Sequence, residues 1–561
     1  EAFTDYTDAN SELQVVRRYS SAGGGRWRIA DLNQQLVDYS SPSGITSSNA
    51  LRGLVSYVPE GIYYSAPRPA RIESWVPFHL INTDDHLVHA IDFVDRYGNR
   101  TRYSGTSPNS FQSQSPRKSS IALLPQVDGS RNYMVTIPSE GISVFDHLGN
   151  LMSHTSPTGR RTEYQRGVSN TVVTSQFSGR TLSYNIDPVT RSLESVTLPN
   201  GRQISYQHTT SGQLDTVTFA DGTTMRYIYS EPSSVPHPDK NPSWLTGVID
   251  ESGTRYATFA YDDSSPITTE RAGGAGRYKF KRTDDGINAF ISSGSAEVTM
   301  SDGVSKNVIS WTRGPDGERR LVSQSQPAGA GCAASTTRIE YDSGGNRHSV
   351  DDFNGARICY DNDLGRGLEI SRVEGLVGGS DCAGVLPAES SLPAGSRKFG
   401  TQWHPVWQLP IKIAEPRRVS TWVYNGQPDP FNGTSVANCA PTDAVLPDGN
   451  PIAVLCKKVE QSTTDANGAQ GFNAVLDSTA PARTWTYAYN QWGQVLTASD
   501  PVAATTTYSY YTDTISDHTK GDLQSVTDAA GRTTRHTRYD PDGRVLSQTD
   551  PTGVVTTNTY D

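Results

Sequence analysis

The stretch Tyr539–Asp561 reads YDPDGRVLSQTDPTGVVTTNTYD and decides the fold. It starts and ends on Tyr-Asp, so Tyr539 to Tyr560 is one period of 21 residues. Two turn sequences, DPDG and DPTG, divide the period into two halves of about ten residues each. The sequence therefore describes a unit that can be repeated along the chain.

Each half of this unit predicts a strand followed by a tight turn. Asp accepts hydrogen bonds from the backbone of its own turn, Pro fixes φ at the next position, and Gly takes the left-handed conformation, here at Gly543 and Gly553. The runs between the turns are rich in Val, Leu, Thr and Tyr with strand-like alternation. Strand and turn at ten-residue spacing predict a meander of antiparallel hairpins.

The same elements recur in the same order along most of residues 76–561. Variants lie near residues 93–103, 145–164, 198–229, 250–262, 341–361, 487–494 and 527–532. The Tyr and Asp positions that we assign as structural repeat positions are Tyr261, Asp262, Tyr341, Asp342, Tyr360, Asp361, Tyr539, Asp540, Tyr560 and Asp561. We interpret these tyrosines as members of ladders on one sheet face, not as catalytic groups.

The pattern YDxxGRVxxxTDPxGxxTxxxYD resembles the YD repeat of bacterial Rhs proteins, which also occurs in insecticidal toxin-complex shells and in teneurins. The N-terminal residues add to this resemblance. Asp5-Tyr6, the stretch Leu13–Ser21 with its Arg-x-Tyr-x-Ser ending and the downstream Trp27 are similar to the segment that leads into the repeats of Rhs proteins. In that family the ribbon of hairpins spirals into a hollow cocoon.

The fold class that we predict is all-β: a long antiparallel β-hairpin ribbon of YD repeats, coiled into a spiral shell or cocoon. One hairpin cannot bury a core alone, so neighbours must stack, and a twisted ribbon coils. We divide the chain into an N-terminal β segment at 1–75, ribbon at 76–426, a polar insertion at 427–483 and further repeats at 484–561. Both ends of the chain fall within patterns that look cut.

Composition excludes several classes of protein. Apolar residues make up 34% of the 561 residues and charged residues only 19%, and the remainder is the Ser, Thr, Gly and Asn typical of β-surfaces and turns. The net charge of −10 is mild for this length, and no basic patch interleaved with aromatics predicts nucleic-acid binding. No run of about 18 apolar residues predicts a membrane span.

The five cysteines all lie in the second half of the chain and form no C-x-x-C motif. Disulfides in a secreted chain would leave one cysteine over. We predict that Cys439 pairs with Cys456, because both fall in one polar segment. Free buried thiols in a cytoplasmic chain are the alternative.

Two stretches interrupt the repeat. Residues 427–483 contain both of these cysteines and are predicted to be a loop or hairpin that projects from the ribbon, with decoration favoured over a binding role. Asn432-Gly433-Thr434 matches a glycosylation acceptor by chance. Residues 399–425 hold several aromatics near proline, which could cap a ribbon end or bind a sugar, and packing is favoured.

The sequence predicts no catalytic residue, no cofactor and no metal site. The best metal-like cluster is His79, Asp84, Asp85, His86 and His89, but on a strand the last two histidines would face opposite sides. No nucleophile elbow, metalloprotease helix or phosphate-binding loop is present. The resemblance implies self-cleavage in a region after the repeats, and no residue here matches that region. A hydrolase on a β-scaffold is the least favoured alternative.

These observations predict a non-enzymatic shell segment of an Rhs-type polymorphic toxin. It would enclose and help to deliver a C-terminal toxin that is not in this chain, and it would be bacterial and secreted or on the cell surface. Its partners would be that toxin cargo or further repeats. The alternative is an extracellular structural protein that forms fibres with other copies, or that binds glycans, through its repeats.

Overall fold

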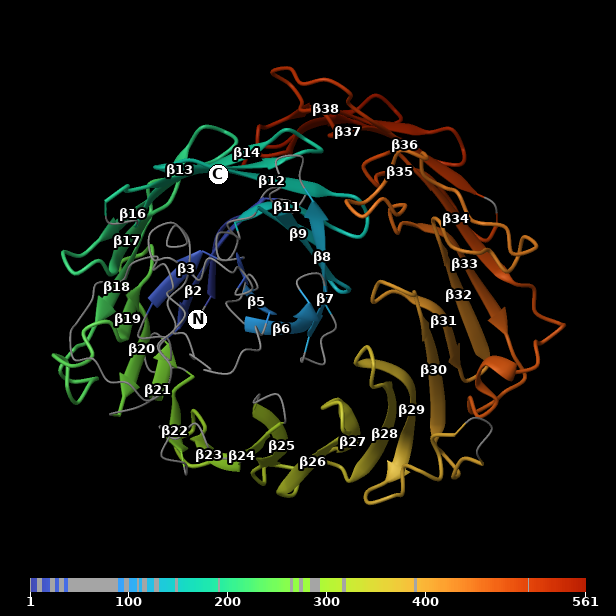
Figure 1. Ribbon diagram of the computed structural model, residues 1–561, viewed down its shortest axis with the longest axis horizontal. Coiled ribbons are helices and arrows are strands. Elements are labelled where there is room, and N and C mark those ends of the chain that lie inside the picture. Colours follow the sequence, from blue (N-terminus) through green and yellow to red (C-terminus); the bar gives the residue numbers. More distant parts are fainter. Residues whose placement is uncertain are drawn as a thin grey trace.

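The computed structural model describes residues 2–7, 13–20, 26–29, 35–38, 89–94, 100–107, 110–113, 119–125, 131–146, 150–189, 192–262, 266–271, 276–282, 293–314, 319–387, 391–502 and 504–560. Within this part of the chain nearly every element is a β-strand, and the strands follow one another around a coil (Figure 1). The predicted cluster at His79, Asp84, Asp85 and His86 lies outside the described residues, as does Asp561.

Two small antiparallel sheets come first. The strands of the first are β1 (Ala2–Thr7), β2 (Gln14–Ser20) and β3 (Arg26–Ile29), and those of the second are β4 (Gln35–Asp38), β5 (His89–Val94), β6 (Arg100–Ser107) and β7 (Ser110–Ser113).

All further strands belong to one long ribbon. Its first part comprises β8 (Ser120–Pro125), β9 (Arg131–Ile137), β10 (Gly141–Phe145), β11 (Leu151–Thr155), β12 (Arg161–Arg166), β13 (Asn170–Ser175), β14 (Thr181–Ile186), β15 (Leu193–Thr197), β16 (Gln203–His208), β17 (Leu214–Thr218), β18 (Thr224–Tyr229), β19 (Leu245–Ile249), β20 (Arg255–Tyr261), β21 (Pro266–Arg271), β22 (Tyr278–Arg282) and β23 (Ser293–Thr299).

Its second part comprises β24 (Lys306–Arg313), β25 (Arg319–Gln326), β26 (Ser335–Tyr341), β27 (Arg347–Asp351), β28 (Ala356–Asp363), β29 (Leu368–Val377), β30 (Arg397–Trp403), β31 (Pro410–Glu415), β32 (Arg418–Tyr424), β33 (Leu455–Ser462), the 3₁₀ turn η3 (Gly471–Asn473), β34 (Arg483–Tyr489), β35 (Val495–Ser499), β36 (Thr505–Tyr510), β37 (Leu523–Thr527), β38 (Thr533–Tyr539), β39 (Val545–Thr549) and β40 (Val555–Thr557).

Each ribbon strand pairs antiparallel with its neighbours in the sequence, from β8 paired with β9 to β39 paired with β40. Such pairing in chain order is a continuous hairpin meander. The predicted all-β ribbon of antiparallel hairpins is therefore confirmed.

The turns use the Asp-x-x-Gly chemistry predicted from the sequence. At Asp540 the side-chain Oδ1 accepts the Arg544 N–H at 2.8 Å, and the backbone carbonyl accepts the Gly543 N–H at 3.0 Å. Asp550 repeats the arrangement with Val554 and Gly553. The Thr552 hydroxyl and the turn amides hold the pKa of Asp550 below its usual value. Every such turn therefore closes its own backbone hydrogen bonds.

The curvature of the ribbon has a local cause in its bulges. The pairing register shifts by one residue at the last position of alternate strands, at Tyr229, Tyr261, Tyr341, Tyr424, Tyr489, Tyr510 and Tyr539. A bulge bends its strand and increases the local twist. Because these bulges recur along one edge of the ribbon, their bends add up in one direction and the ribbon coils.

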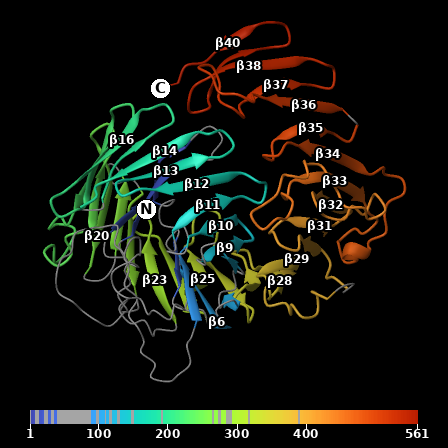
Figure 2. The same ribbon diagram turned by 45° about the horizontal axis from the view of Figure 1, so that its top comes forward.

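The coil passes through slightly more than one circuit. Figure 1 shows the strands running from β12 through β20, β26 and β32 back to β38, which lies near β12 and β14 at the top of the view. Figure 2 separates the two levels, with β36 to β40 above β12 to β14. β2 and β3 lie inside the circuit. The ribbon is therefore a spiral, as predicted.

The largest core lies on the inner face of the first part of the ribbon. Leu13, which directly precedes β2, and Val15 within β2 are buried against a row that includes Tyr184, Val196 and Val217. The Tyr184 hydroxyl donates to the Gln14 carbonyl at 3.2 Å. The N-terminal segment therefore seals the inner wall at this place.

The range 427–483 contains a strand of the ribbon. β33 divides it into a connection at 425–454 and another at 463–482. The second connection places Phe472 of η3 next to Gly400 and Lys412 of neighbouring strands. The first does not project from the ribbon, because it packs against β9 and β10 of the earlier circuit.

Candidate functional site

Two levels of the spiral meet along a line of hairpin turns that we call the seam. On the first level it comprises the turns at 138–140, 156–160, 176–180 and 198–202. On the second level it comprises the connections at 404–409, 425–454, 490–494, 511–522 and 540–544. Backbone hydrogen bonds cross it from Gln408 N–H to the Pro138 carbonyl at 2.9 Å and from Ala453 N–H to the Pro157 carbonyl at 2.7 Å.

One part of the seam is apolar. Ile142 and Met134 on the first level pack with Trp407, Leu446 and Ile452 on the second, and all five side chains are buried. Burial of apolar area stabilises such a contact at about 25 cal/mol per Å². The connection at 425–454 therefore supplies a small core that joins the two levels.

The other part of the seam is polar. The buried Arg180 side chain donates from Nη2 to both carboxylate oxygens of Asp522 at 2.9 Å, and from Nε to the Pro541 carbonyl at 2.8 Å. Asn200 Nδ2 donates to Asp542 Oδ2 at 2.7 Å. The second Asp522 oxygen also accepts the Thr519 N–H. These bonds give the seam a defined register, because Arg180 and Asn200 of one level bond specific groups of the other.

Glycine is required where the levels approach most closely. A Cβ on Gly493, whose φ is +70°, would lie 2.2 Å from the Thr158 carbonyl oxygen. A Cβ on Gly521 would lie 2.4 Å from the Phe177 ring. The ring of Phe177 is therefore seated on the bare backbone of Gly521.

The tyrosines at the strand ends have a specific role in each hairpin. Their hydroxyls donate to the carbonyl of a residue at or near the start of the preceding strand. The pairs are Tyr229 to Leu214, Tyr261 to Leu245, Tyr341 to Leu321, Tyr424 to Pro410, Tyr489 to Leu455, Tyr510 to Val495, Tyr539 to Leu523 and Tyr560 to Val545. The tyrosine ties the bulged strand end to its hairpin partner, which sequence reasoning missed.

Burial raises the pKa values of several of these tyrosine hydroxyls. It raises the pKa of Tyr424, Tyr489 and Tyr510 to about 12, and it raises the pKa of Tyr539 further. Neutral phenols are the donors that the arrangement needs. Tyr360 and Asp361, assigned as a repeat pair from the sequence, lie inside β28, and the turn after this strand begins at Asp363.

The inner wall of the second part of the ribbon carries a ladder of aromatic rings and cations. Trp422, Lys458 and Trp485 lie opposite one another on β32, β33 and β34. Lys458 Nζ lies 4.9 Å from the centroid of the Trp485 ring and 2.7 Å from Glu460. Trp422 precedes Tyr424 by two residues, as Tyr227 of the buried inner row precedes Tyr229, and this shared spacing is our reason for assigning Trp422 to the inner wall.

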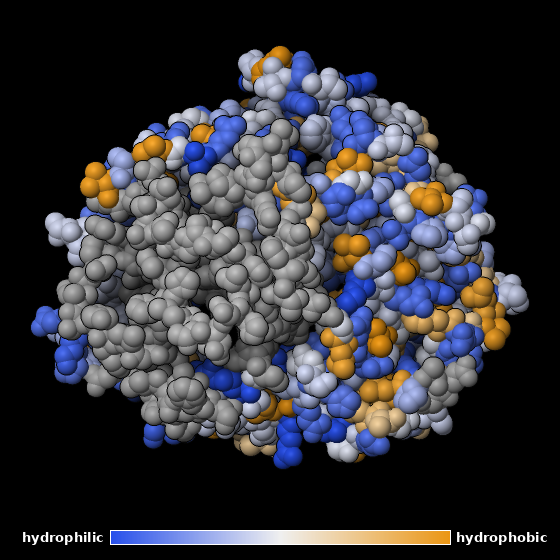
Figure 3. All heavy atoms as spheres, in the orientation of Figure 1, coloured by the Kyte–Doolittle hydropathy of each residue, from blue (hydrophilic) through white to orange (hydrophobic). Residues whose placement is uncertain are grey.

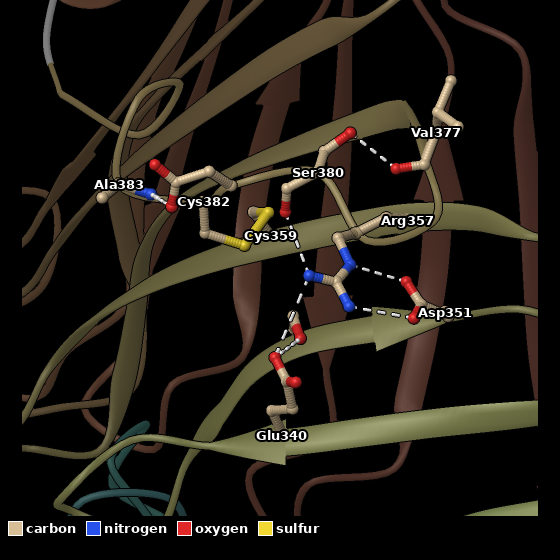
Figure 4. Close-up of a disulfide and its surroundings, with 10 residues drawn as sticks. Glu340, Asp351, Arg357, Cys359, Val377, Ser380, Cys382 and Ala383 are labelled. Carbon is tan, nitrogen blue, oxygen red and sulfur yellow. Dashed lines mark hydrogen bonds and ion pairs between the residues drawn. A yellow bond between two sulfur atoms is a disulfide. The ribbon is translucent and has the colours of Figure 1, made fainter.

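Two disulfides fasten long connections to the ribbon. Cys439 is joined to Cys456, the pair named from the sequence, and Cys359 to Cys382, a pair that the sequence did not suggest. Cys332 is the exposed cysteine left over. In Figure 4 the Arg357 side chain lies beside Cys359, with Nε 2.6 Å from Asp351 and Nη1 donating to the Ser380 carbonyl at 3.0 Å.

In the described part of the chain, no three His, Cys, Asp or Glu side chains gather as they would around a metal ion. Among the residues that the structure describes, no helix is long and apolar enough to cross a membrane. Of the predicted histidine cluster only His89 falls in a described strand, at the start of β5.

Comparisons with known proteins agree with the repeat. The RHS Repeat family model matches residues 518–555. No curated protein matches the chain. Among solved structures, the chain is similar to "Crystal Structure of TcdB2-TccC3", with 12% identity and a TM-score of 0.37 over 98% of this chain and 27% of that one.

A second similar structure is that of a Photorhabdus luminescens Tc holotoxin pore, with 13% identity and a TM-score of 0.22 over 84% of this chain and 30% of that one. The chain thus spans less than a third of the length of the solved chains it matches. The matched RHS repeat at 518–555 belongs to a series of hairpins with the same turns and the same tyrosine bond along the ribbon.

Proposed function

We propose that this chain is a structural shell segment of an Rhs-type toxin, which encloses a toxin carried on chain outside residues 1–561 and helps to deliver it. The observation that carries the proposal is the seam. A ribbon that only presented repeats could remain open. In this ribbon, the buried Arg180–Asp522 pair holds one circuit against the next. Enclosure is a use for which such fastening is needed.

The two faces of the ribbon differ in a way that favours enclosure. The inner wall is sealed by Leu13 and Val15 in its first part and carries half-buried Trp422, Trp485 and Tyr508 in its second. Figure 3 looks down the coil, and the rim that it shows outside the grey atoms is mostly hydrophilic with scattered apolar residues. Scattered apolar residues are ordinary for a solvated surface, and a fibre interface would need a larger patch.

The alternative of a fibre-forming or glycan-binding protein has one observation in its favour. β40 is exposed at Val555, and its outer edge could pair with another strand. Glycan stacking on the Trp faces is disfavoured, because Lys458 and Arg483 already cover the ring of Trp485. We therefore rank the shell first.

A non-enzymatic role, secretion and action outside the producing cell belong to the same proposal. Two disulfides suit an oxidising environment after export. The partners on this proposal are the toxin cargo within and further components of the delivery machinery.

The test uses the native protein with all the chain that follows residue 561. Limited trypsin digestion should leave that following segment intact in the wild type and cut it in the seam variant Asn200→Ala/Asp522→Ala. Equal cleavage in both proteins would overturn the proposal. Cryo-electron microscopy of the same particles should show single coils, and filaments joined through ribbon edges would favour the fibre alternative.

A further inference from the structure

The Cys439–Cys456 disulfide lies within the connection that forms the apolar part of the seam. It joins the middle of the 425–454 connection to the second residue of β33. The Asn425 side chain accepts the Cys439 N–H at 3.1 Å, and the Cys439 carbonyl accepts the Tyr489 N–H at 2.8 Å. The cysteine is therefore bonded to both ends of the loop and to β34.

What this disulfide holds in place is the seam itself. Ala440 follows Cys439 directly, and together with Ala444, Leu446 and Ile452 it packs on Met134 and Ile142 of the other level. The backbone bond from Ala453 to Pro157 lies three residues before Cys456. Without the cross-link, the ordering of the connection from Asn425 to Val454 depends on those contacts, on hydrogen bonds within the connection and on the ion pair between Asp429 and Lys457.

The two disulfides differ in their exposure to a reductant. Cys439 is half-buried and Cys456 is 8% exposed, whereas Cys359 and Cys382 are 0% and 4% exposed. The Cys359–Cys382 disulfide packs with Val373, Leu376 and Val385 in a separate cluster that contains no residue of the seam. Thiol exchange requires access to the disulfide, and Cys439 is the least buried of the four bonded cysteines, so the seam disulfide is the more accessible of the two.

We propose that the Cys439–Cys456 disulfide is a redox latch on the spiral: its reduction releases the apolar part of the seam, while the polar part around Arg180 and Asp522 stays closed. The reductant is a dithiol of the kind that thiol-rich compartments supply. One thiolate attacks the Sγ of one cysteine, which breaks the S–S bond, forms a mixed disulfide and releases the other cysteine as a thiolate. The second thiolate of the reductant then attacks the reductant's own sulfur in the mixed disulfide and releases the first cysteine, and the two cysteines take up the protons that the dithiol has lost. The protein gains two thiols and the reductant becomes a cyclic disulfide, so two electrons pass to the protein.

The latch would let the spiral stay closed in an oxidising medium and loosen in a reducing one. That consequence for enclosed cargo rests on the proposed shell function, but the latch itself concerns only this chain. A test that measures the opening of the seam directly therefore distinguishes the latch from the proposed shell function, because the latch can be present whether or not cargo is enclosed.

The experiment is hydrogen–deuterium exchange with mass spectrometry on the purified protein, with and without dithiothreitol. A Cys332→Ser background removes the free exposed thiol, which could otherwise exchange with the disulfides. The variants are Cys439→Ala/Cys456→Ala and, as the matched control, Cys359→Ala/Cys382→Ala. Iodoacetamide labelling at each step reports which cysteines are reduced.

Dithiothreitol should lower protection on both sides of the apolar seam, in 425–454 and in 131–158, on the order of 100-fold for a loop of this size. Residues 192–202 and 519–544 should keep their protection. The same pattern should follow reductant in the Cys359→Ala/Cys382→Ala protein and be present without reductant in the Cys439→Ala/Cys456→Ala protein.

Two results would overturn the latch. Faster exchange confined to 425–454, with 131–158 unchanged, would mean that the loop loosens and the seam stays closed. Unchanged exchange in both segments, with Cys439 and Cys456 shown by labelling to be reduced, would mean that the disulfide holds nothing. Because the Cys332→Ser protein with both disulfides intact gives either answer when reductant is added, the inference does not depend on the folding of the disulfide variants.

Discussion

Arg180 and Asp522 are separated by 342 residues, and their side chains meet in two hydrogen bonds of 2.9 Å with only 2% and 1% of each exposed. One belongs to the turn after β13 and the other to the turn before β37. The pair therefore joins the start of one circuit of the ribbon to the end of it. Removing one partner of such a pair leaves a buried charge without compensation.

Asp522→Ala should therefore destabilise the protein by about 3–5 kcal/mol, whereas the double substitution Arg180→Met/Asp522→Leu should recover most of the loss. Urea unfolding followed by tryptophan fluorescence measures both. Arg532→Ala is the control, because its partner Asp528 is exposed, and it should cost less than about 1 kcal/mol. A double variant as unstable as Asp522→Ala would refute the role of the pair.

Gly493 and Gly531 occupy the same left-handed position of two turns, with φ of +70° and +77°. An alanine at Gly531 meets no atom within 4 Å, so it should cost only the backbone strain of about 1–2 kcal/mol. An alanine at Gly493 would also press on the Thr158 carbonyl and part the seam. Thermal unfolding should show a clearly larger loss for Gly493→Ala, and equal losses would mean that the levels do not touch there.

Two tyrosines of β36 allow the contribution of the hydroxyl hydrogen bond to stability to be distinguished from that of ring packing. The Tyr510 hydroxyl donates to the Val495 carbonyl at 2.9 Å, whereas the Tyr508 hydroxyl has no bond to a described residue. Tyr510→Phe should cost about 1 kcal/mol, and Tyr508→Phe should be near neutral. The urea midpoints of the two variants measure these losses. A larger loss of stability in Tyr508→Phe than in Tyr510→Phe would contradict the role assigned to the Tyr510 hydroxyl.

His404 should make the stability of the protein depend on pH. It is 4% exposed, and burial, followed by the charge of Arg366, lowers its pKa to about 4. Its Nδ1 accepts the N–H groups of Val406 and Trp407 and so must stay neutral. The unfolded chain takes up a proton near pH 6.5 and the folded chain does not, so this contribution is full above pH 6.5 and is lost as the pH falls toward 4.

The loss attributable to His404 is at most about 3 kcal/mol. His404→Asn keeps an acceptor at the Nδ1 position and removes the titration, so its urea midpoint should vary less between pH 6.5 and 4 than that of the wild type. His237→Asn, at an exposed position, should follow the wild type. A variant His404→Asn with the full pH dependence would show that other groups are responsible.

The local structure of each hairpin could be predicted from the sequence. The Asp, Pro and Gly of residues 540–553 specify their turns through contacts within five residues, and the alternation between them specifies strands. The hydroxyl bond of each tyrosine could have been found from its fixed place before the turn, since that place recurs at Tyr341, Tyr489 and Tyr539.

The seam could not be predicted in this way. Whether Arg180 meets Asp522 depends on the radius and pitch of the coil, which sum small bends over the whole circuit. Nothing in the local sequence of either turn names its partner. The 425–454 connection looked like decoration for the same reason, because the surface that covers its apolar residues comes from β9 and β10.

The one-residue bulges described above also restrict how this chain can change in length. The Arg180–Asp522 contact therefore depends on how many strands lie between β14 and β36. Inserting one 21-residue repeat there would displace Asp522 by two strand spacings, about 10 Å. Recombination between these similar hairpins would thus be tolerated only in combinations that restore the number of strands between Arg180 and Asp522.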